Sequence, residues 1–316
     1  MSIFKLSPAF KDYIWGGSRL KTDFFKNTDM TPLAESWELS VHSDGESIIC
    51  GGEFDKMGFS QYVSEHPQAM GTNCQRFENF PILIKLIDAY DNLSVQVHPD
   101  NEYAMRVEGE YGKTEMWYIV DCEENAELIY GFDREISKEE FAQRIENNTL
   151  LEVVNKVKVN KGDVFFIEAG TLHAIGKGIL IAEIQQNSNT TYRVYDYGRV
   201  GADGKPRALH IEKALDVTNL KTAPLKNCGE AVCVNGVCTR MLARCEYFDV
   251  SELKIETEAE LFADESTFNS LLFIDGQGII ECDGQKIEFR KGDSVFVSAD
   301  TRYKISGKCI CILTKI

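Results

Sequence analysis

The sequence predicts a mainly β protein made of two related β-barrel units, with several helices inserted in the N-terminal half. Short strand patterns dominate the chain, one segment recurs in its C-terminal third, and the helical patterns all precede Thr218. With 43% hydrophobic residues among 316, the chain has enough apolar side chains for one large or two ordinary domains.

The expected strands are short segments, apolar or alternating, in which Val, Ile and Phe are frequent. They run over Leu93 to Val97, Met116 to Val120, Asp163 to Ile167, Ile179 to Ile184, Asn269 to Ile274, Ile279 to Cys282 and Ser294 to Val297. Helices are expected over Phe59 to Met70, Asp100 to Glu108, Ser137 to Leu150 and His210 to Val217. The third helix has the strongest signal, because Ser137 and Glu140 form a capping box ahead of apolar residues at helical spacing.

An internal repeat divides the chain. Residues 157–175, VKVNKGDVFFIEAGTLHAI, align with residues 287–305, IEFRKGDSVFVSADTRYKI, and His173 in the first copy aligns with Tyr303 in the second. We therefore predict two domains: residues 1–225, with the candidate site and the helical insertions, and residues 226–316, a degenerate β unit without metal ligands. The linker is expected near Thr222 to Val232, where Pro224, Gly229 and a loss of periodicity mark a break.

The charge balance restricts the partners of the chain. Its 50 acidic and 34 basic residues give a formal charge of -16, which would repel a nucleic acid or an anionic membrane, so neither is expected as a partner. The N-terminal segment has no signal-peptide pattern, and no apolar run approaches the roughly 20 residues that span a bilayer. A cytoplasmic location is expected. The sequence does not indicate the oligomeric state.

The ten cysteines are expected to be thiols, for the most part small buried side chains in strands. Cys228, Cys233, Cys238 and Cys245 lack the CxxC pairs of structural zinc sites. Among the histidines, three are expected at the surface or at helix caps, although the first lies in a segment that could face a site. These are His42, His66 and His210.

The remaining histidines belong to a set with metal-ligand chemistry. Gln96 and His98 lie two residues apart on an expected strand, so both point to one face, which is the lumen if the sheet closes into a barrel. Glu115 opens the next strand and His173 ends the repeated segment. Two imidazoles, a carboxylate and an amide oxygen can bind a divalent metal and leave positions for water or substrate, which is a catalytic pattern.

The spacing of these residues resembles that of cupins, which are double-stranded β-helix (jelly-roll) barrels. Gly162, Gly170 and His173 fit the second cupin motif, with Glu168 in place of its usual proline. Longer motifs extend the resemblance over nearly the whole chain: YIWGG (13–17), ESWELS (35–40), FPILIKLIDA (80–89), LSVQVHPDNEYA (93–104), GKTEMWYI (112–119), EAGTLHAIG (168–176) and AEIQQNSNTTYRVYDYGR (182–199). They resemble the class I, zinc-dependent mannose-6-phosphate isomerases of the short bacterial type.

The resemblance implies an isomerase that interconverts mannose 6-phosphate and fructose 6-phosphate, with one Zn²⁺ per chain. It implies that Gln96, His98, Glu115 and His173 hold the metal. It also implies that Arg193 acts in the active site and that Glu183 lines the same pocket. The substrate-binding candidates are Ser94 and Lys85, which resemble pocket positions of the family, and Arg199, for which a functional and a surface role are equally expected.

Chemistry supports several of these assignments without settling the proton transfer. Arg193 can bind a phosphate or stabilise an oxyanion with its planar fork of donors. Lys85 lies in the apolar run ILIKLI, where burial is costly without a partner or a substrate phosphate. Isomerisation through a cis-enediol needs an acid/base group, and either Glu183 or Lys113 could serve. Glu183 could instead orient a metal ligand.

Two other classes of function are compatible with such a fold. A non-catalytic sugar-binding or regulatory cupin could dispense with the metal set, Lys113 and Arg193, whereas all are present. A cupin oxygenase usually needs redox-active iron and more histidines. An isomerase is therefore favoured.

Overall fold

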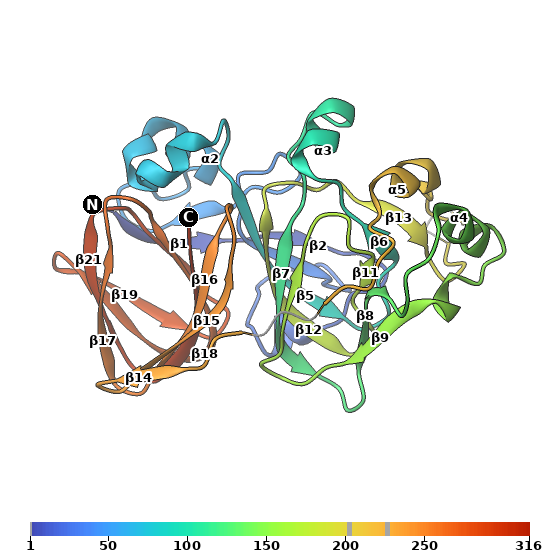
Figure 1. Ribbon diagram of the computed structural model, residues 1–316. Helices are drawn as coiled ribbons and strands as arrows, with labels where there is room; N and C mark the ends of the chain where they lie inside the picture. The colour runs from blue at the N-terminus through green and yellow to red at the C-terminus, as the bar shows by residue number, and fades with distance from the viewer. Residues whose placement is uncertain (1, 201–203, 225–227) are drawn as a thin grey trace.

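The computed structural model describes residues 2–200, 204–224 and 228–316. Two β-barrels lie side by side, and both chain termini lie at the barrel formed by the C-terminal strands (Figure 1). We call the barrel that contains the candidate site the first barrel and the C-terminal one the second barrel. The mainly β prediction with two barrel units is confirmed.

The first barrel consists of two antiparallel sheets. One has the strand order β10 (Val164–Ile167), β7 (Glu115–Cys122), β12 (Ile179–Gln186), β5 (Ile82–Ala89), β3 (Glu35–Leu39) and β2 (Ala9–Lys11). The other has the order β13 (Tyr192–Tyr195), β6 (Val95–Val97), β11 (His173–Ala174), β8 (Glu127–Phe132) and β9 (Val154–Lys158). Strands β5, β7 and β12 are almost wholly buried because both of their faces are covered.

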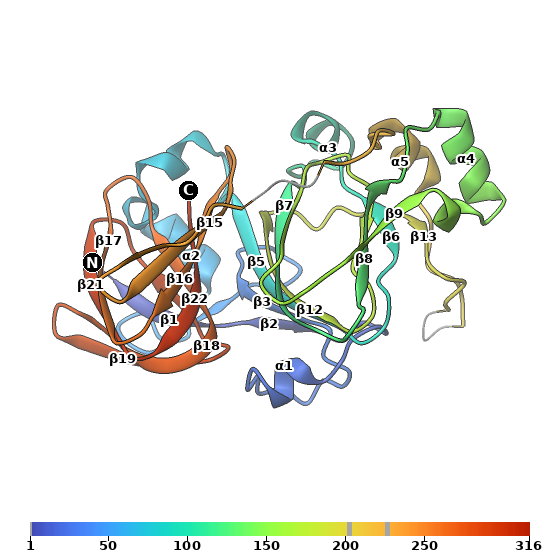
Figure 2. The same ribbon diagram turned by 60° about the horizontal axis from the view of Figure 1, so that its bottom comes forward.

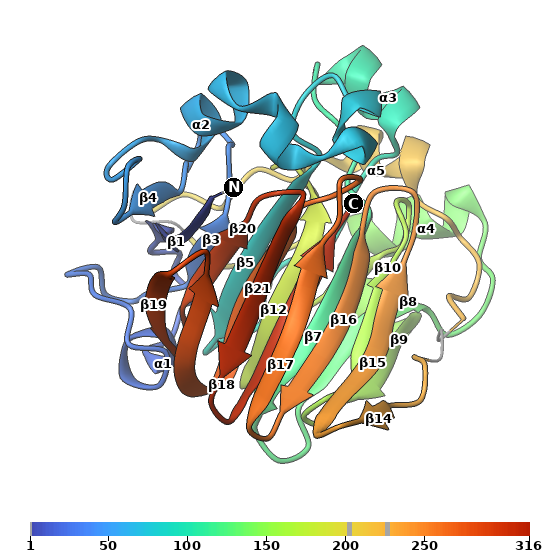
Figure 3. The ribbon, with the colours of Figure 1, turned by 90° about the vertical axis from the view of Figure 1, so that its left-hand side faces the viewer.

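The second barrel is one large antiparallel sheet, which Figure 3 shows in front of the first barrel. Its main path is β14 (Val232–Val234), β15 (Val237–Arg244), β16 (Asp249–Ile255), β22 (Cys309–Lys315), β18 (Asn269–Cys282), β20 (Ser294–Val297), β1 (Ile3–Ser7) and β4 (Ile48–Cys50). Strands β17 (Glu258–Ala263), β19 (Gln285–Arg290) and β21 (Thr301–Ser306) complete it. The N-terminal strands β1 and β4 therefore lie in the same sheet as the C-terminal strands.

Most helices lie at the rims of the first barrel, whereas α2 (Phe59–Glu65) lies over the second barrel (Figure 1). Helices α3 (Asn101–Val107), α4 (Lys138–Glu146) and α5 (Ile211–Val217) lie along one rim, and α1 (Arg19–Thr22) lies on the opposite side (Figure 2). Helix α2 continues into the 3₁₀ turns η1 (Pro67–Met70) and η2 (Thr72–Arg76), and η3 (Leu150–Glu152) follows α4. The four helices expected from the sequence are confirmed within a few residues, and Ser137 caps α4 by accepting from the Glu140 amide.

The repeat is confirmed in the backbone. Gly162 and Gly292 both have a positive φ, 88° and 92°, which a residue with a side chain rarely adopts. Their amides donate to Ile119 and Phe273 at 2.8 and 2.7 Å, in β7 and β18. The two copies therefore form the same turn against corresponding strands.

The two barrels share a hydrophobic core. It joins Phe4 and Phe296 of the second barrel with Ile82, Ile84 and Met116 of the first. The barrels therefore pack through apolar side chains as well as through the chain connection. Part of the expected linker, residues 225–227, lies outside the described residues.

The expectation that every cysteine is a thiol is wrong for one pair. Cys233 and Cys238 form a disulfide between β14 and β15. A tight turn at Asn235 and Gly236, both with positive φ, places the two cysteines directly opposite each other. Among the described residues, the other eight cysteines form no disulfide, and Cys50 is exposed rather than buried. In the described part of the chain, no helix has the length and apolar character needed to cross a bilayer.

Candidate metal centre

Three of the four expected ligands converge inside the first barrel. His98, Glu115 and His173 are fully buried, and one potential ligand atom from each lies within 4.8 Å of the other two. Glu115 Oε2 lies 3.6 Å from His98 Nε2, and Glu115 Oε1 lies 3.5 Å from His173 Nε2. The Gln96 amide is 3.5 Å from His173 Nε2, because Gln96 and His173 face each other across β6 and β11.

Both imidazoles are fixed through their Nδ1 atoms. His98 Nδ1 lies 2.9 Å from the Thr190 carbonyl, and His173 Nδ1 lies 2.8 Å from the Thr171 carbonyl. Since a carbonyl only accepts, each Nδ1 carries the proton and each Nε2 presents a lone pair to the cluster. His98 Nε2 and Glu115 Oε1 have no hydrogen-bond partner among the described residues. Buried polar atoms without a hydrogen-bond partner are suited to bind a metal ion.

The protonation states also fit a cation. Burial, assisted by the charge of Lys113, lowers the pKa of His98 well below its ordinary value, and burial lowers the pKa of His173 to about 4. Both histidines are therefore neutral near pH 7, which is the metal-binding form. Burial raises the pKa of Glu115 to about 7 against the attraction of Lys113. Two imidazoles, a carboxylate and an amide suit zinc or a similar divalent ion.

Two buried lysines balance the carboxylates around this cluster. Lys113 Nζ lies 3.1 Å from Glu115, and Lys85 Nζ lies 3.3 Å from Glu183 and 3.7 Å from Glu35. Burial lowers the pKa of Lys85, but Glu35 and Glu183 raise it more, so the lysine stays charged. Burial raises the pKa of Glu183, but Lys113 and Lys85 lower it more. Glu183 is therefore an ionised carboxylate.

A cavity of about 270 Å³ adjoins the cluster. Among the residues expected at a site, it is lined by Lys85, Ser94, Gln96, Lys113, Glu183 and Arg193. Arg193 Nε donates to the Ser94 hydroxyl at 3.1 Å, and Arg193 Nη1 donates to the Ala208 carbonyl at 3.1 Å. Arg193 and Gln96 are paired across β13 and β6, which places the guanidinium next to the metal-ligand strand.

Arg199 does not line this cavity. Its guanidinium donates to Asp196 at 2.6 Å and to the Asn92 carbonyl. Arg207, which sequence reasoning missed, lines the cavity and donates to Asp196 at 2.5 and 2.7 Å. No motif in the sequence distinguishes Arg207 from a surface arginine.

Other lining residues were also missed as site residues. Tyr13, Trp15 and Glu35 lie in the motifs YIWGG and ESWELS, which carried the family resemblance but no role. His210 precedes α5 at its N-cap position, as expected, but it also lines the cavity. The surface expectation for His42 is wrong. Its ring is buried against Trp37, since the loop after β3 folds back over that strand.

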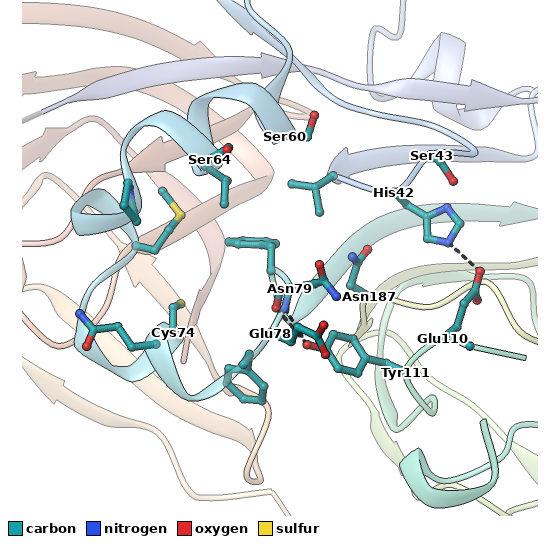
Figure 4. Close-up of a pocket in the computed structure, with 18 of the residues that line it drawn as sticks. His42, Ser43, Ser60, Ser64, Cys74, Glu78, Asn79, Glu110, Tyr111 and Asn187 are labelled. Atoms are coloured by element: carbon teal, nitrogen blue, oxygen red, sulfur yellow. Dashed lines mark hydrogen bonds and ion pairs between the residues drawn. The ribbon is translucent and has the colours of Figure 1, made fainter. Parts of the chain in front are cut away.

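A larger cavity, of about 620 Å³, lies between α2, η2 and the segment after α3 (Figure 4). His42 Nε2 lies 3.7 Å from Glu110 Oε1 at one end. The Tyr111 hydroxyl accepts a hydrogen bond from the Asn79 amide and donates one to the Asn79 carbonyl. Neither lysine nor arginine lines this cavity among the described residues, and it shares no lining residue with the smaller one. It is therefore poorly suited to hold a phosphate.

The two barrels and the buried His–Glu–His cluster define a cupin-type protein with a candidate metal site. The profile described as "Phosphomannose isomerase type I, catalytic domain" matches residues 3–130, and that of "Mannose-6-phosphate isomerase, cupin domain" matches residues 238–316. The chain belongs to the type I phosphomannose isomerase family.

Known relatives extend over the same length. "Mannose-6-phosphate isomerase ManA" of Bacillus subtilis is 37% identical, with 98% of this chain and 97% of the relative covered. A mannose-6-phosphate isomerase of Streptococcus mutans is 38% identical, with 90% of this chain and 88% of the relative covered. The crystal structure of the mannose 6-phosphate isomerase from Bacillus subtilis superposes with a TM-score of 0.94 at 35% identity, covering 100% of both chains. A putative mannosephosphate isomerase from Archaeoglobus fulgidus, at 22% identity and TM-score 0.79 over 99% and 96%, shares the fold.

Proposed function

We propose that this protein interconverts mannose 6-phosphate and fructose 6-phosphate through a cis-enediol. The observation that carries the proposal is the cavity lined by Lys113, Glu183 and Arg193. It adjoins the cluster of His98, Glu115 and His173. Acid/base groups, an oxyanion-stabilising guanidinium and a candidate metal site are the parts that an aldose–ketose isomerisation needs. The full-length match to mannose-6-phosphate isomerases supports it.

The proposed cofactor is one Zn²⁺ per chain, held by Gln96, His98, Glu115 and His173. A bound Zn²⁺ would supply Lewis-acid polarisation of the sugar oxygens. The hydrogen bonds from the two imidazoles to the Thr190 and Thr171 carbonyls support this set, because they fix the ring orientation that the ligands need.

The proton between C1 and C2 is proposed to move through Glu183 or Lys113. Glu183 is ionised, receives a hydrogen bond from Trp117 Nε1 at 2.9 Å and can accept a proton from carbon. Lys113 lines the same cavity and could instead transfer the proton. Glu183→Gln and Lys113→Met separate these roles. In single-turnover experiments, the variant that lacks the true base should no longer exchange the C2 proton of the substrate with solvent.

Of the other candidate residues, two are proposed to contact the substrate and two to position groups of the site. Arg193 stabilises the negative oxygen of the enediolate, and Ser94 contacts the substrate beside it. Lys85 is held between two carboxylates, so its proposed part is to keep Glu183 charged and in place. Arg199 is proposed to act through Asp196, with which it is paired.

A direct assay tests the function. Isomerisation of mannose 6-phosphate should be present as purified, vanish after chelation and return on addition of zinc. A sugar-binding sensor would bind the sugar phosphate without turnover, and an oxygenase would consume O₂ with iron. Turnover that survives complete metal removal would contradict the metal-dependent mechanism.

Several further expectations stay proposals. They are a domain division at residues 1–225 and 226–316, a cytoplasmic location and a small-molecule sugar phosphate as the partner. The division by residue number simplifies the fold, because β1 and β4 lie in the sheet of the second barrel. Separate expression of the two halves would test whether either folds alone.

A further inference from the structure

The smaller cavity has two ends of opposite charge. At one end the lining includes Glu35, Glu183, Lys85 and Lys113, and Glu115 lies behind it, 3.1 Å from Lys113. This excess of negative charge suits a divalent cation.

The other end is rich in arginine. Arg193 and Arg207 line it, and Arg199 lies beside them. Among the described residues, buried Asp196 pairs with Arg199 and Arg207, and the exposed Asp91 lies 3.8 Å from Arg199. Arg193 forms no ion pair within the described residues, although its side chain is largely buried and bonds to Ser94. Burial and the positive charge of Arg207 lower the pKa of Arg193, so the two guanidinium groups lie within each other's field. In a chain with net charge -16, such a local excess of positive charge suits an anion.

Of the two arginines paired with Asp196, one faces the cavity. Arg207 lines it and keeps a side chain that is 23% exposed, whereas Arg199 is 15% exposed and donates to the Asn92 carbonyl outside the lining. Asp196 accepts from Arg207 at Nε and one terminal nitrogen, which leaves the other terminal nitrogen without that partner. The segment that carries Arg207 is fixed to β13, because Arg193 exchanges hydrogen bonds with His210 and donates to Ala208.

We propose that Arg207 binds the phosphate group of the substrate, with Asp196 as the positioning residue that aims its guanidinium into the cavity. The proposal rests on the proposed isomerase function and orients the substrate in the site. The phosphate lies at the arginine end, and C1 and C2 lie toward Glu183, Lys113 and the metal ligands. Arg199 takes no direct part.

The test compares Arg207→Met, Arg207→Lys and a control, Arg134→Met. Arg134 is an exposed arginine of the first barrel that pairs with Glu140 and lies outside the cavity lining. Arg207→Met should raise the KM for mannose 6-phosphate about ten- to a hundredfold with kcat little changed, since a charge-assisted bond to the substrate is lost equally in the ground and transition states. Arg207→Lys should recover part of the affinity, because it keeps the charge without the fork.

Binding of inorganic phosphate, measured by calorimetry on the metal-loaded protein, gives a readout that does not need turnover. The wild type and Arg134→Met should bind phosphate equally, and Arg207→Met should bind it about tenfold or more weakly. Unchanged phosphate binding and an unchanged KM in a folded Arg207→Met protein would overturn the inference. A lower kcat and a lower melting temperature with normal phosphate affinity would also overturn it. An inactive wild type that still loses phosphate affinity in Arg207→Met would contradict the isomerase function and leave the anion site standing.

Discussion

The first and second barrels share the repeated turn and the strand pairing around it, and they differ in the side chains at the corresponding positions. In the first barrel, Glu115 of β7 pairs with Ile167 of β10. At the corresponding place in the second barrel, Asn269 of β18 pairs with Val297 of β20, and Tyr303 corresponds to His173. The Glu115–His173 pair of the first barrel is therefore replaced by an Asn269–Tyr303 pair in the second. There the Asn269 amide donates to the Tyr303 hydroxyl at 2.9 Å.

The other two candidate ligands are replaced by apolar residues. His173 faces Gln96 across β11 and β6, and Tyr303 faces Leu261 across β21 and β17. Two residues further along, His98 corresponds to Ala263. The positions of the four candidate ligands in the first barrel thus hold a neutral hydrogen-bonded pair and two apolar side chains in the second.

This difference shows that the second barrel does not depend on the candidate metal ligands. The second barrel closes around an apolar core that includes Tyr303, Ile305 and Phe273, without charged groups at these positions. The second barrel therefore closes without these candidate ligands, and the buried charged residues of the first barrel carry a desolvation cost that the second barrel avoids.

The largest expected effect comes from breaking the first barrel's cluster. His98→Ala or His173→Ala should lower kcat/KM by more than about 100-fold, since even the loss of residues behind a metal ligand costs about 10- to 100-fold. Both proteins should remain folded by circular dichroism, as the second barrel is without such ligands. His66→Ala, at the end of α2, is the control and should be fully active. Global unfolding of either site variant would make the cluster structural.

Arg193→Ala should have the next largest effect, on kcat. A donor that acts mainly in the transition state contributes about 10²-fold, by analogy with oxyanion-hole groups. Arg193→Lys should not restore it, because a point charge cannot reproduce the planar fork. Steady-state kinetics with an unchanged kcat and a raised KM would place Arg193 in the phosphate site beside Arg207.

The pH dependence of metal binding should identify the group that loses a proton. The pKa of Glu115 is raised to about 7, so below that pH its proton competes with the metal, while His98 and His173 are already neutral. Zinc affinity should therefore fall about tenfold per pH unit between about pH 7 and 5.5, and be nearly flat from about pH 7.5 to 8. A slope of two or more protons, measured by competition with a chelator, would mean that the histidines also titrate.

The smallest effect is expected in the second barrel. Tyr303→Phe removes the hydroxyl that accepts from the buried Asn269 amide, which should lower the free energy of unfolding by about 1–3 kcal/mol. Urea denaturation measures the loss. Activity and metal content should equal those of the wild type, and a loss of either would show that the second barrel has a part in the site.

Local signals in the sequence predicted much of this arrangement. The Lys-Gly-Asp turn was recognisable in both copies because its glycine needs a positive φ, and Ser137 capped its helix as its spacing indicated. The candidate ligands were also identifiable, because Gln96 and His98 are spaced to point to one face and the family motifs implied the full set. The structure brings His98, Glu115 and His173 together as that set requires.

Features that depend on distant pairing could not be predicted in this way. Strand β1 joins β20 across nearly the whole chain, and no local pattern encodes such a partner. Arg207 faces the cavity only because its segment bonds to Arg193 and Asp196, so it resembled any surface arginine. The Cys233–Cys238 disulfide depends on the turn between the two strands, which the search for CxxC pairs overlooked.

The decisive experiment on the metal ligands copies the second barrel's pair into the first. The double variant Glu115→Asn/His173→Tyr and the wild type should be purified together, loaded with zinc and analysed for metal by mass spectrometry. We expect about one zinc per wild-type chain and none in the variant, which should stay folded because the second barrel already holds this pair at the corresponding positions. Retention of zinc by the folded variant would contradict the claim that Glu115 and His173 hold the metal.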